Sequence, residues 1–186
     1  ETQLEAVAQV RPLELVRVYS RRPENRERFA AAMAQRLGLA IEAVDSAERA
    51  VREADLVITA TNARDPVLAG DWLRPGVHVN AVGSNHARRR ELDLECFRRA
   101  SLVVADSVAQ ARLESGDLIA ACEAGLPGWD QVAELKDFPA RRRDEDITIF
   151  KSNGLALEDV AVAAWVYQQV AAIPTSEAAD PPPARR

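Results

Sequence analysis

The chain has 186 residues, and its content of 47% hydrophobic and 28% charged residues is typical of a globular protein. A net charge of −5 gives nucleic-acid binding no electrostatic support, and no apolar run reaches the roughly 18 residues of a membrane span. The spacing of Cys96 and Cys122 fits neither a metal site nor a redox pair, and no secretory signal opens the chain. We therefore expect a reduced, cytoplasmic protein with no metal.

Helix and strand patterns alternate along the chain. The chain begins inside an amphipathic helix, because Leu4, Val7 and Ala8 already share one face. Pro23 suits the first turn of the next helix, and Gly38 suits its C-terminal cap. Strands are predicted over residues 15–19, 39–44, 55–61, 77–82, 102–105 and 147–151.

Two later helix starts carry capping signals. Asp45 with Glu48 resembles a capping box, and Ser107 with Gln110 predicts a second capped start. The strand 55–61 is the most hydrophobic, so we expect burial on both of its faces. The alternation as a whole predicts an α/β fold with a doubly wound parallel sheet.

The remaining segments are less regular. Residues 121–146 predict surface loop with short helices, and the Pro-rich stretch from 173 to 186 predicts a disordered tail. The runs Arg88–Arg90 and Arg141–Arg143 are each followed closely by acids, Glu91 among them. We interpret both runs as solvated faces.

A doubly wound sheet binds ligands beyond the carboxyl ends of its strands. The first of these ends carries Ser20, Arg21 and Arg22. A hydroxyl together with an arginine at this position suits the 2′-phosphate of NADP, whereas an acidic residue would bind the ribose hydroxyls of NAD. NADP is therefore the favoured cofactor, although an Arg-rich turn that solvates a helix start gives the same pattern.

Two further strand ends carry small and polar residues. The candidates for cofactor binding there are Thr59, Ala60, Thr61, Asn62, Val82, Gly83 and Ser84. Gly83 lacks a Cβ and permits close approach, and Asn85 and His86 follow with further donors and acceptors. Ordinary strand-to-loop chemistry explains each end alone, but three successive ends favour a nucleotide crevice.

The phosphate-binding fingerprint G-x-G-x-x-G is absent from the eight glycines of the chain. A glycine loop just before Glu1 would stand about 20 residues ahead of Ser20, which is the usual spacing. We therefore expect the chain to be the second part of a longer protein.

Five strings carry a resemblance to a known family: VRVYSR, ADLVITATNARDPVL, WLRPGVHVNAVGSN, RRELD and ITIFKSNGLALED. Over residues 15–169 the chain resembles the nucleotide-binding half of the ornithine cyclodeaminase/mu-crystallin family. The resemblance implies a Rossmann domain, incomplete at its N-terminus, over residues 1–151. Residues 152–172 would form a helix that returns to a substrate and dimerisation domain, followed by the tail 173–186.

The resemblance also implies an activity. Family members transfer hydride between a nicotinamide cofactor and the α-carbon of a small amino or imino acid, and the full-length protein would be a homodimer. The alternatives are a non-catalytic, NADP-dependent ligand-binding protein of the mu-crystallin type, or an inactive fragment. Ser152 and Gly154 would be small groups beside the cofactor, whereas Lys151 is expected to point outward.

Two residues are candidates on the substrate side. Asn85 matches the position of the cyclodeaminase Asp that serves the substrate amine, and an amide cannot act as a general base. The resemblance therefore favours a dehydrogenase or reductase over a cyclodeaminase. His86 is a candidate proton carrier, although a loop histidine in contact with solvent or cofactor is the simpler explanation.

Overall fold

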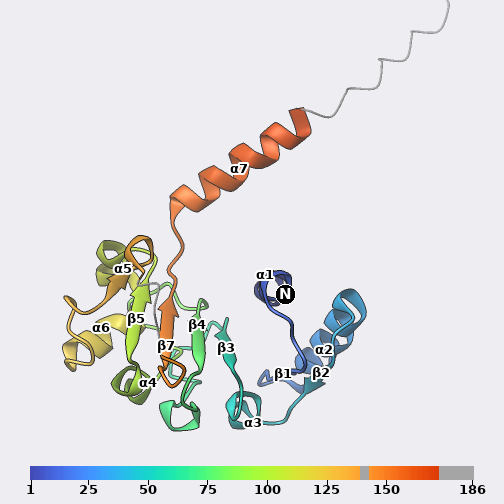
Figure 1. Cartoon of the computed structure of the whole chain (residues 1–186), viewed down its shortest axis with the longest axis horizontal. Helices are drawn as coiled ribbons and strands as arrows, with labels where there is room; N and C mark the ends of the chain where they lie inside the picture. The colour runs from blue at the N-terminus through green and yellow to red at the C-terminus, as the bar shows by residue number, and fades with distance from the viewer. Residues whose placement is uncertain (139–142, 172–186) are drawn as a thin grey trace, which may run out of the picture. The chain divides into compact units, whose positions relative to one another are not determined.

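Parallel strands form the framework of the protein. The computed structural model describes residues 1–138 and 143–171 (Figure 1). Within it, Glu1–Asn153 forms one compact unit, and the segment from Gly154 onward forms a second. The predicted tail and the residues Arg141 and Arg142 lie outside the described residues.

The first unit holds two parallel sheets. A two-stranded sheet pairs β1 (Val16–Val18) with β2 (Ile41–Ala43). A five-stranded sheet has the order β3-β4-β7-β5-β6, and every neighbouring pair in it is parallel. Its strands are β3 (Leu56–Thr59), β4 (His78–Ala81), β7 (Thr148–Lys151), β5 (Leu102–Ala105) and β6 (Ala133–Glu134). The predicted α/β fold with a parallel sheet is confirmed.

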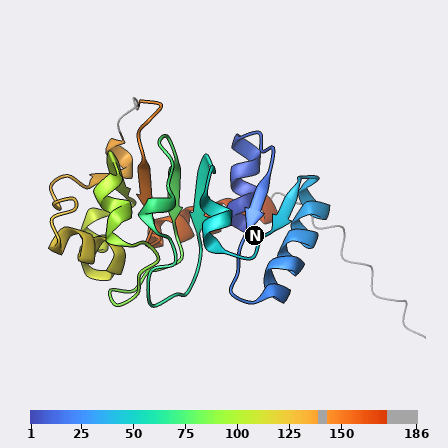
Figure 2. The same ribbon diagram turned by 90° about the horizontal axis from the view of Figure 1, so that it is seen from below.

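The last strand lies in the middle of the larger sheet. β7 is inserted between β4 and β5, with Ile149 opposite both Val79 and Val103 (Figure 2, orange strand among green ones). Val79 and Ile149 are fully buried. The core of the unit therefore forms around β4, β7 and β5, because these strands have neighbours on both sides.

The hydrophobic strand β3 is less buried than predicted. Val57 and Thr59 are buried, whereas Leu56 and Ile58 are only half-buried. In the part of the chain that the structure describes, β3 pairs with β4 alone. The expectation of burial on both faces was wrong because this strand stands at a sheet edge.

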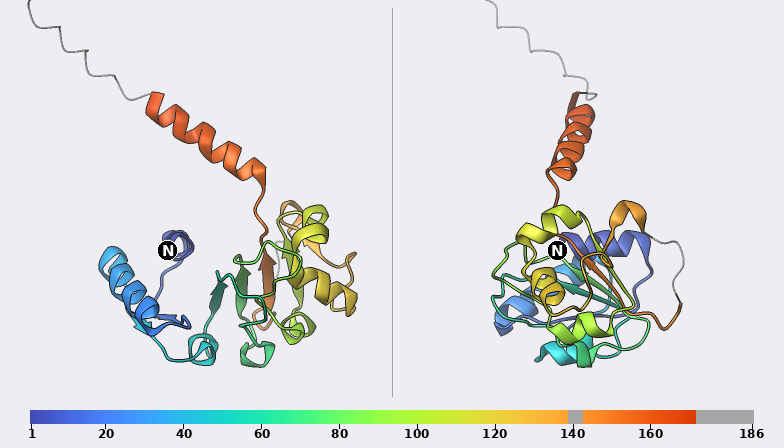
Figure 3. Two further views of the ribbon diagram at one scale, coloured as in Figure 1. Left: turned by 180° about the vertical axis from the view of Figure 1, so that it is seen from behind. Right: turned by 90° about the vertical axis from the view of Figure 1, so that its left-hand side faces the viewer.

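Helices precede the first strand and connect the later ones. They are α1 (Thr2–Val10), α2 (Pro23–Leu37), α3 (Ala47–Val51), α4 (Leu94–Arg99), α5 (Val108–Glu114) and α6 (Gly116–Glu123), with the 3-10 turns η1 (Gly70–Trp72) and η2 (Leu135–Asp137). α2 packs against β1 and β2 (Figure 3, left).

Most of the predicted caps are present. Pro23 opens α2, and Gly38 ends it in the left-handed conformation with φ of 67°. Ser107 accepts a hydrogen bond from the backbone N–H of Gln110, as predicted. The capping box at Asp45 was wrong, because α3 is capped by the next residue, Ser46.

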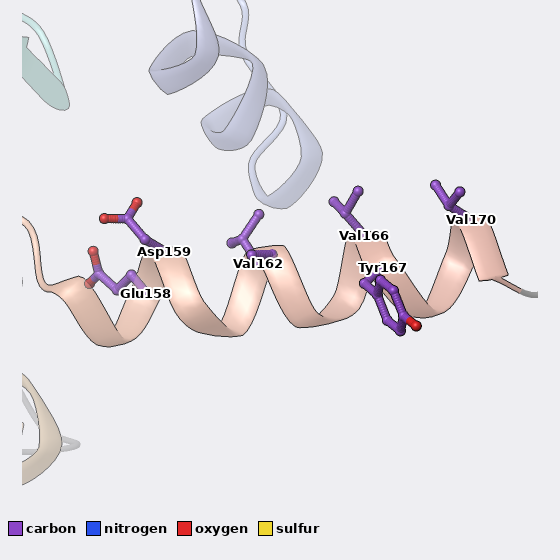
Figure 4. Close-up of a pocket in the computed structure, with 7 residues that line it drawn as sticks. Glu158, Asp159, Val162, Val166, Tyr167 and Val170 are labelled. Atoms are coloured by element: carbon purple, nitrogen blue, oxygen red, sulfur yellow. The ribbon is translucent and has the colours of Figure 1, made fainter.

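The second unit contains α7 (Ala156–Ala171), and none of the residues of this helix is buried. Its large apolar side chains are exposed, and Trp165 has 61% of its surface accessible. Figure 4 shows Val162, Val166 and Val170 in a row along one face, since residues four apart share a face. Neither α7 nor any other described helix is long and apolar enough to cross a membrane.

Candidate functional site

The carboxyl ends of β3, β4 and β7 meet at one edge of the five-stranded sheet, because these strands are adjacent and parallel. Thr59 is the last residue of β3 and Ala60–Asn62 follow it, Val82–Ser84 follow β4, and Ser152 follows β7. These three predicted groups are therefore brought together. Thr59 and Ser84 are buried, whereas Ala60, Thr61 and Asn62 are exposed.

Glu91 joins the loops that follow β3 and β4. Its side chain is 0% exposed, and its Oε1 accepts a hydrogen bond of 2.6 Å from the backbone N–H of Thr61. Oε2 accepts from the backbone N–H groups of Gly83 at 2.8 Å and Ser84 at 3.2 Å. The hydroxyl of Thr59 donates to the same oxygen at 3.1 Å. One carboxylate thus receives four donors, one from the last residue of β3 and three from the loops after β3 and β4. Arg88 and Arg89 are exposed, as expected for a solvated face, but the acid that follows their run is buried.

The need for glycine at position 83 comes from this contact between the loops. A Cβ on Gly83 would stand closer than 3.0 Å to the backbone of Thr61 and to the Glu91 carboxylate. We expected Gly83 to admit a ligand, but the space beside its Cα is filled by protein. Gly83 lets the loop after β3 pack directly on the loop after β4.

Lys151 is a buried residue of the site, and the expectation that it points outward was wrong. It is 0% exposed, and its Nζ donates to the backbone carbonyls of Ala81 at 3.3 Å, Ser152 at 2.7 Å and Ser84. These three bonds use all three donors of an ammonium group.

Charged neighbours act on this lysine from several elements. Burial lowers the pKa of Lys151 below its ordinary value of 10.5, and the carboxylates of Asp117, Glu91 and Asp106 oppose that shift. Because a buried ammonium is costly without compensation, these three acids explain how a lysine is accommodated here.

Asp106 holds the turn that follows β7. Its Oδ2 accepts from the Ser152 hydroxyl at 3.0 Å and from the Asn153 backbone N–H at 2.7 Å. Asn153 is 8% exposed, and neither polar atom of its side chain has a hydrogen-bond partner in the described structure. A buried amide without partners lowers stability by about 1–3 kcal/mol for each unsatisfied group. Asn153 is therefore suited to receive a ligand.

Asp117 supports the same network from α6. It is 1% exposed, and its Oδ1 accepts from the backbone N–H groups of Glu91 at 2.8 Å and Leu92 at 3.0 Å. Burial raises the pKa of Asp117 above its ordinary value, against the effect of these two N–H groups.

The substrate-side candidates lie on an exposed loop. Asn85 and His86 are both exposed, and His86 Nδ1 accepts from the backbone N–H of Arg88 at 3.1 Å. Ser84 donates its hydroxyl to the carbonyl of Arg89 at 3.0 Å, which ties the loop to the buried edge. His86 Nε2 is therefore the ring nitrogen that could exchange a proton with a ligand.

The remaining cofactor candidates lie elsewhere in the chain. Ser20, Arg21 and Arg22 follow β1 in the two-stranded sheet, where Arg22 precedes α2 and the Ser20 carbonyl accepts from Arg26. Arg21 and Arg22 are exposed. In residues 1–138 and 143–171, no hydrogen bond or ion pair given by the structure joins them to the loops after β3 and β4. Gly154 belongs to the second unit and has φ of 81°.

Several residues of the network were not predicted to act in a site. They are Glu91, Asp106, Asp117, Lys151 and Asn153. Asp106 carried a usable signal, because it directly follows a buried strand as Ser152 does. Asn153 carried one as well, because it stands between the predicted Ser152 and Gly154. Glu91, Asp117 and Lys151 lacked one, since most of their partners lie far along the sequence. Among the described residues, no group of three His, Cys, Asp or Glu side chains could hold a metal ion.

Comparisons with known proteins identify relatives of this chain. The ketimine reductase mu-crystallin of Mus musculus is 40% identical over 155 residues, which cover 82% of this chain and 46% of the relative. The Delta(1)-pyrroline-2-carboxylate reductase of Bacillus cereus is 39% identical over 171 residues, which cover 89% of this chain and 52% of the relative. The chain thus spans about half the length of these relatives.

A solved structure shows the same fold. The Delta(1)-pyrroline-2-carboxylate reductase of Thermococcus litoralis, in complex with NADH and L-proline, matches with a TM-score of 0.88 and 40% identity. The match covers 91% of this chain and 54% of that one. The sequence profile of the ornithine cyclodeaminase/mu-crystallin family matches residues 1–173, and the predicted resemblance is confirmed. The chain belongs to the ornithine cyclodeaminase/mu-crystallin family.

Proposed function

We propose that the protein containing this chain is an NAD(P)-dependent oxidoreductase that transfers hydride at the α-carbon of a small amino or imino acid. The observation that carries the proposal is the joined edge of β3, β4 and β7, where two loops meet on one buried carboxylate, Glu91. Ligands bind at such an edge in doubly wound sheets. Reductases among the relatives support the reaction type.

The residues present fit a nicotinamide dinucleotide. The unpartnered side-chain amide of Asn153 offers one donor group and one acceptor, which a carboxamide such as that of nicotinamide can satisfy. Ala60, Thr61 and Asn62 are exposed residues, which leaves room for the sugar and phosphate groups. The nicotinamide would supply the hydride chemistry, and the protein would hold and orient it.

Arg21 and Arg22 would select between the two forms of the cofactor. Both side chains are exposed, and a guanidinium binds phosphate oxygens in pairs, so NADP remains the favoured cofactor. The Thermococcus litoralis relative was solved with NADH, so the choice must be measured for this protein.

On the substrate side, the chain offers Asn85 and His86. An amide can orient a substrate but cannot remove a proton, so this loop suits a dehydrogenase or reductase better than a cyclodeaminase. Nε2 of His86 is the candidate proton carrier. The solved relative contains L-proline, and the substrate class proposed here is therefore a small amino or imino acid.

The helix α7 would be the connection to the rest of the protein. Its exposed Val162, Trp165 and Val166 need a surface to cover them. We place that surface in a substrate and dimerisation domain, and the whole protein would act as a homodimer.

The first test is titration of NADH and NADPH into the protein as its gene encodes it, followed by nicotinamide fluorescence. Binding of at least one of them is expected, and binding of neither would refute the proposal. Turnover with Delta(1)-pyrroline-2-carboxylate and other small imino acids is then measured. Binding without turnover of any of them would favour the non-catalytic alternative.

The cofactor preference has its own test. Replacing Arg21 and Arg22 together with Ala is expected to weaken NADPH binding at least about tenfold, because a charged contact to the 2′-phosphate is lost, and to leave NADH binding unchanged. Arg28→Ala is the matched control, because Arg28 is an exposed arginine of the following helix that bonds to Asn25. Equal loss of both cofactors would refute the assignment of these arginines.

A further inference from the structure

The loop Val82–Ser84 lies between two buried groups of opposite charge. On one side, Glu91 accepts from the backbone N–H groups of Gly83 and Ser84. On the other, Lys151 donates to the backbone carbonyls of Ala81 and Ser84. At Ser84, therefore, Glu91 binds the backbone N–H and Lys151 binds the backbone carbonyl of the same residue.

Each of these charged groups also holds a second strand end. Glu91 receives the N–H of Thr61 after β3, and Lys151 donates to the carbonyl of Ser152 after β7. Because β4 lies between β3 and β7, the pair links all three neighbouring loops. Movement of any one of them would break a hydrogen bond to a buried charge.

This arrangement is poorly explained by stability alone. Removing two charges from water is costly, and well-packed apolar residues of similar volume often give an equal or greater stability. Charged groups with several backbone partners instead fix the positions of the loops they bind. Neither side chain is itself exposed, so both must act through the backbone that they hold.

We infer that Glu91 and Lys151 are positioning residues that set the relative placement of the three ligand-facing loops and thereby the affinity for the dinucleotide. The inference rests on the proposed function. In this role, Glu91 and Lys151 affect ligand binding without touching the ligand themselves.

The test compares two carboxylates that both accept backbone N–H groups. In Glu91→Gln, only one oxygen remains to accept. Either the N–H of Thr61, or the donors of Thr59, Gly83 and Ser84, therefore face an NH₂ group and lose their partner, which separates the two loops. Asp93→Ala is the matched control, because Asp93 accepts from the N–H groups of Gly70 and Cys96, outside the loops in question. Thermal unfolding is recorded for both variants, and cofactor affinity is measured where each is folded.

Glu91→Gln is expected to raise the dissociation constant for the dinucleotide at least about tenfold, or 1.4 kcal/mol. Asp93→Ala is expected to lower the unfolding temperature without changing that constant. Unchanged affinity in Glu91→Gln, with binding by the unaltered protein intact, would overturn the inference and leave the proposed function standing. Absence of binding by the unaltered protein would instead sink the proposed function.

A second measurement applies even where Glu91→Gln does not fold. In the unaltered protein, the amide hydrogens of Thr61, Gly83 and Ser84 are expected to exchange with solvent slowly, because all three donate to a buried carboxylate. Fast exchange at these positions, at the rate of the exposed Asn85, would show that the loops are not held and would overturn the inference.

Discussion

Replacing Gly83 with Ala tests the contact between the loops after β3 and β4. The new methyl group would stand closer than 3.0 Å to the backbone of Thr61 and to the carboxylate of Glu91. Overpacking costs about 1–3 kcal/mol, and loss of one hydrogen bond to a charged group costs about 1.5–3 kcal/mol more. We therefore expect the free energy of unfolding to fall by about 2.5–6 kcal/mol, and even the lower value lowers the unfolding temperature by about 5–10 °C.

The assay is urea and thermal unfolding followed by circular dichroism. Gly128→Ala is the control, because its methyl group would closely approach only the end of the flexible Asp130 side chain, which can move away. The control is expected to stay near the unaltered protein. A Gly83→Ala protein within about 0.5 kcal/mol of wild type would refute the reasoning, because that range is typical of unconstrained surface changes.

Three further predictions concern stability and reactivity. Burial raises the pKa of Asp117 above 3.8, so the protonated side chain stabilises the folded protein below pH 3.8, and this contribution is lost as the pH rises through the folded-state pKa. Asp117→Asn should remove this decrease in the free energy of unfolding, as measured by urea unfolding at several pH values. An unchanged pH profile in the variant would contradict the prediction. Ser107→Ala should cost about 1 kcal/mol in the same assay through loss of the α5 cap, and no loss would contradict the capping role. Burial raises the pKa of the Cys96 thiol, so iodoacetamide should label Cys96 only after unfolding, and later than the half-buried Cys122. If Cys96 in the native protein were labelled as fast as Cys122, the prediction would be contradicted.

Local signals predicted most of the framework. Gly38 ends α2 and Ser107 caps α5 as their sequence neighbours indicated, because such caps involve residues only a few positions apart. Every predicted strand is present, although several are shorter than their sequence pattern. The two-residue strand β6 was not predicted, since it forms only by pairing with β5.

The candidate site was predicted in part. The ends of β3 and β4 were chosen from their small and polar residues, and the structure brings them together with Ser152. Gly83 was predicted to leave room for a ligand, whereas in the structure it leaves room for the loop after β3. Lys151 was expected to face outward because alternation along a strand does not distinguish a central strand from an edge strand.

The sequence by itself determined the class of fold, the approximate positions of most strands, and the family, because these follow from hydrophobic periodicity, capping residues and short strings. Only the tertiary structure decided that β7 enters between β4 and β5. That placement brings Lys151 to Ser84 across 67 positions, and the packing of the loops brings Glu91 to Thr61 across 30. A buried charge is stable only where distant backbone groups converge on it, and that convergence is a property of the folded sheet rather than of any segment of the chain.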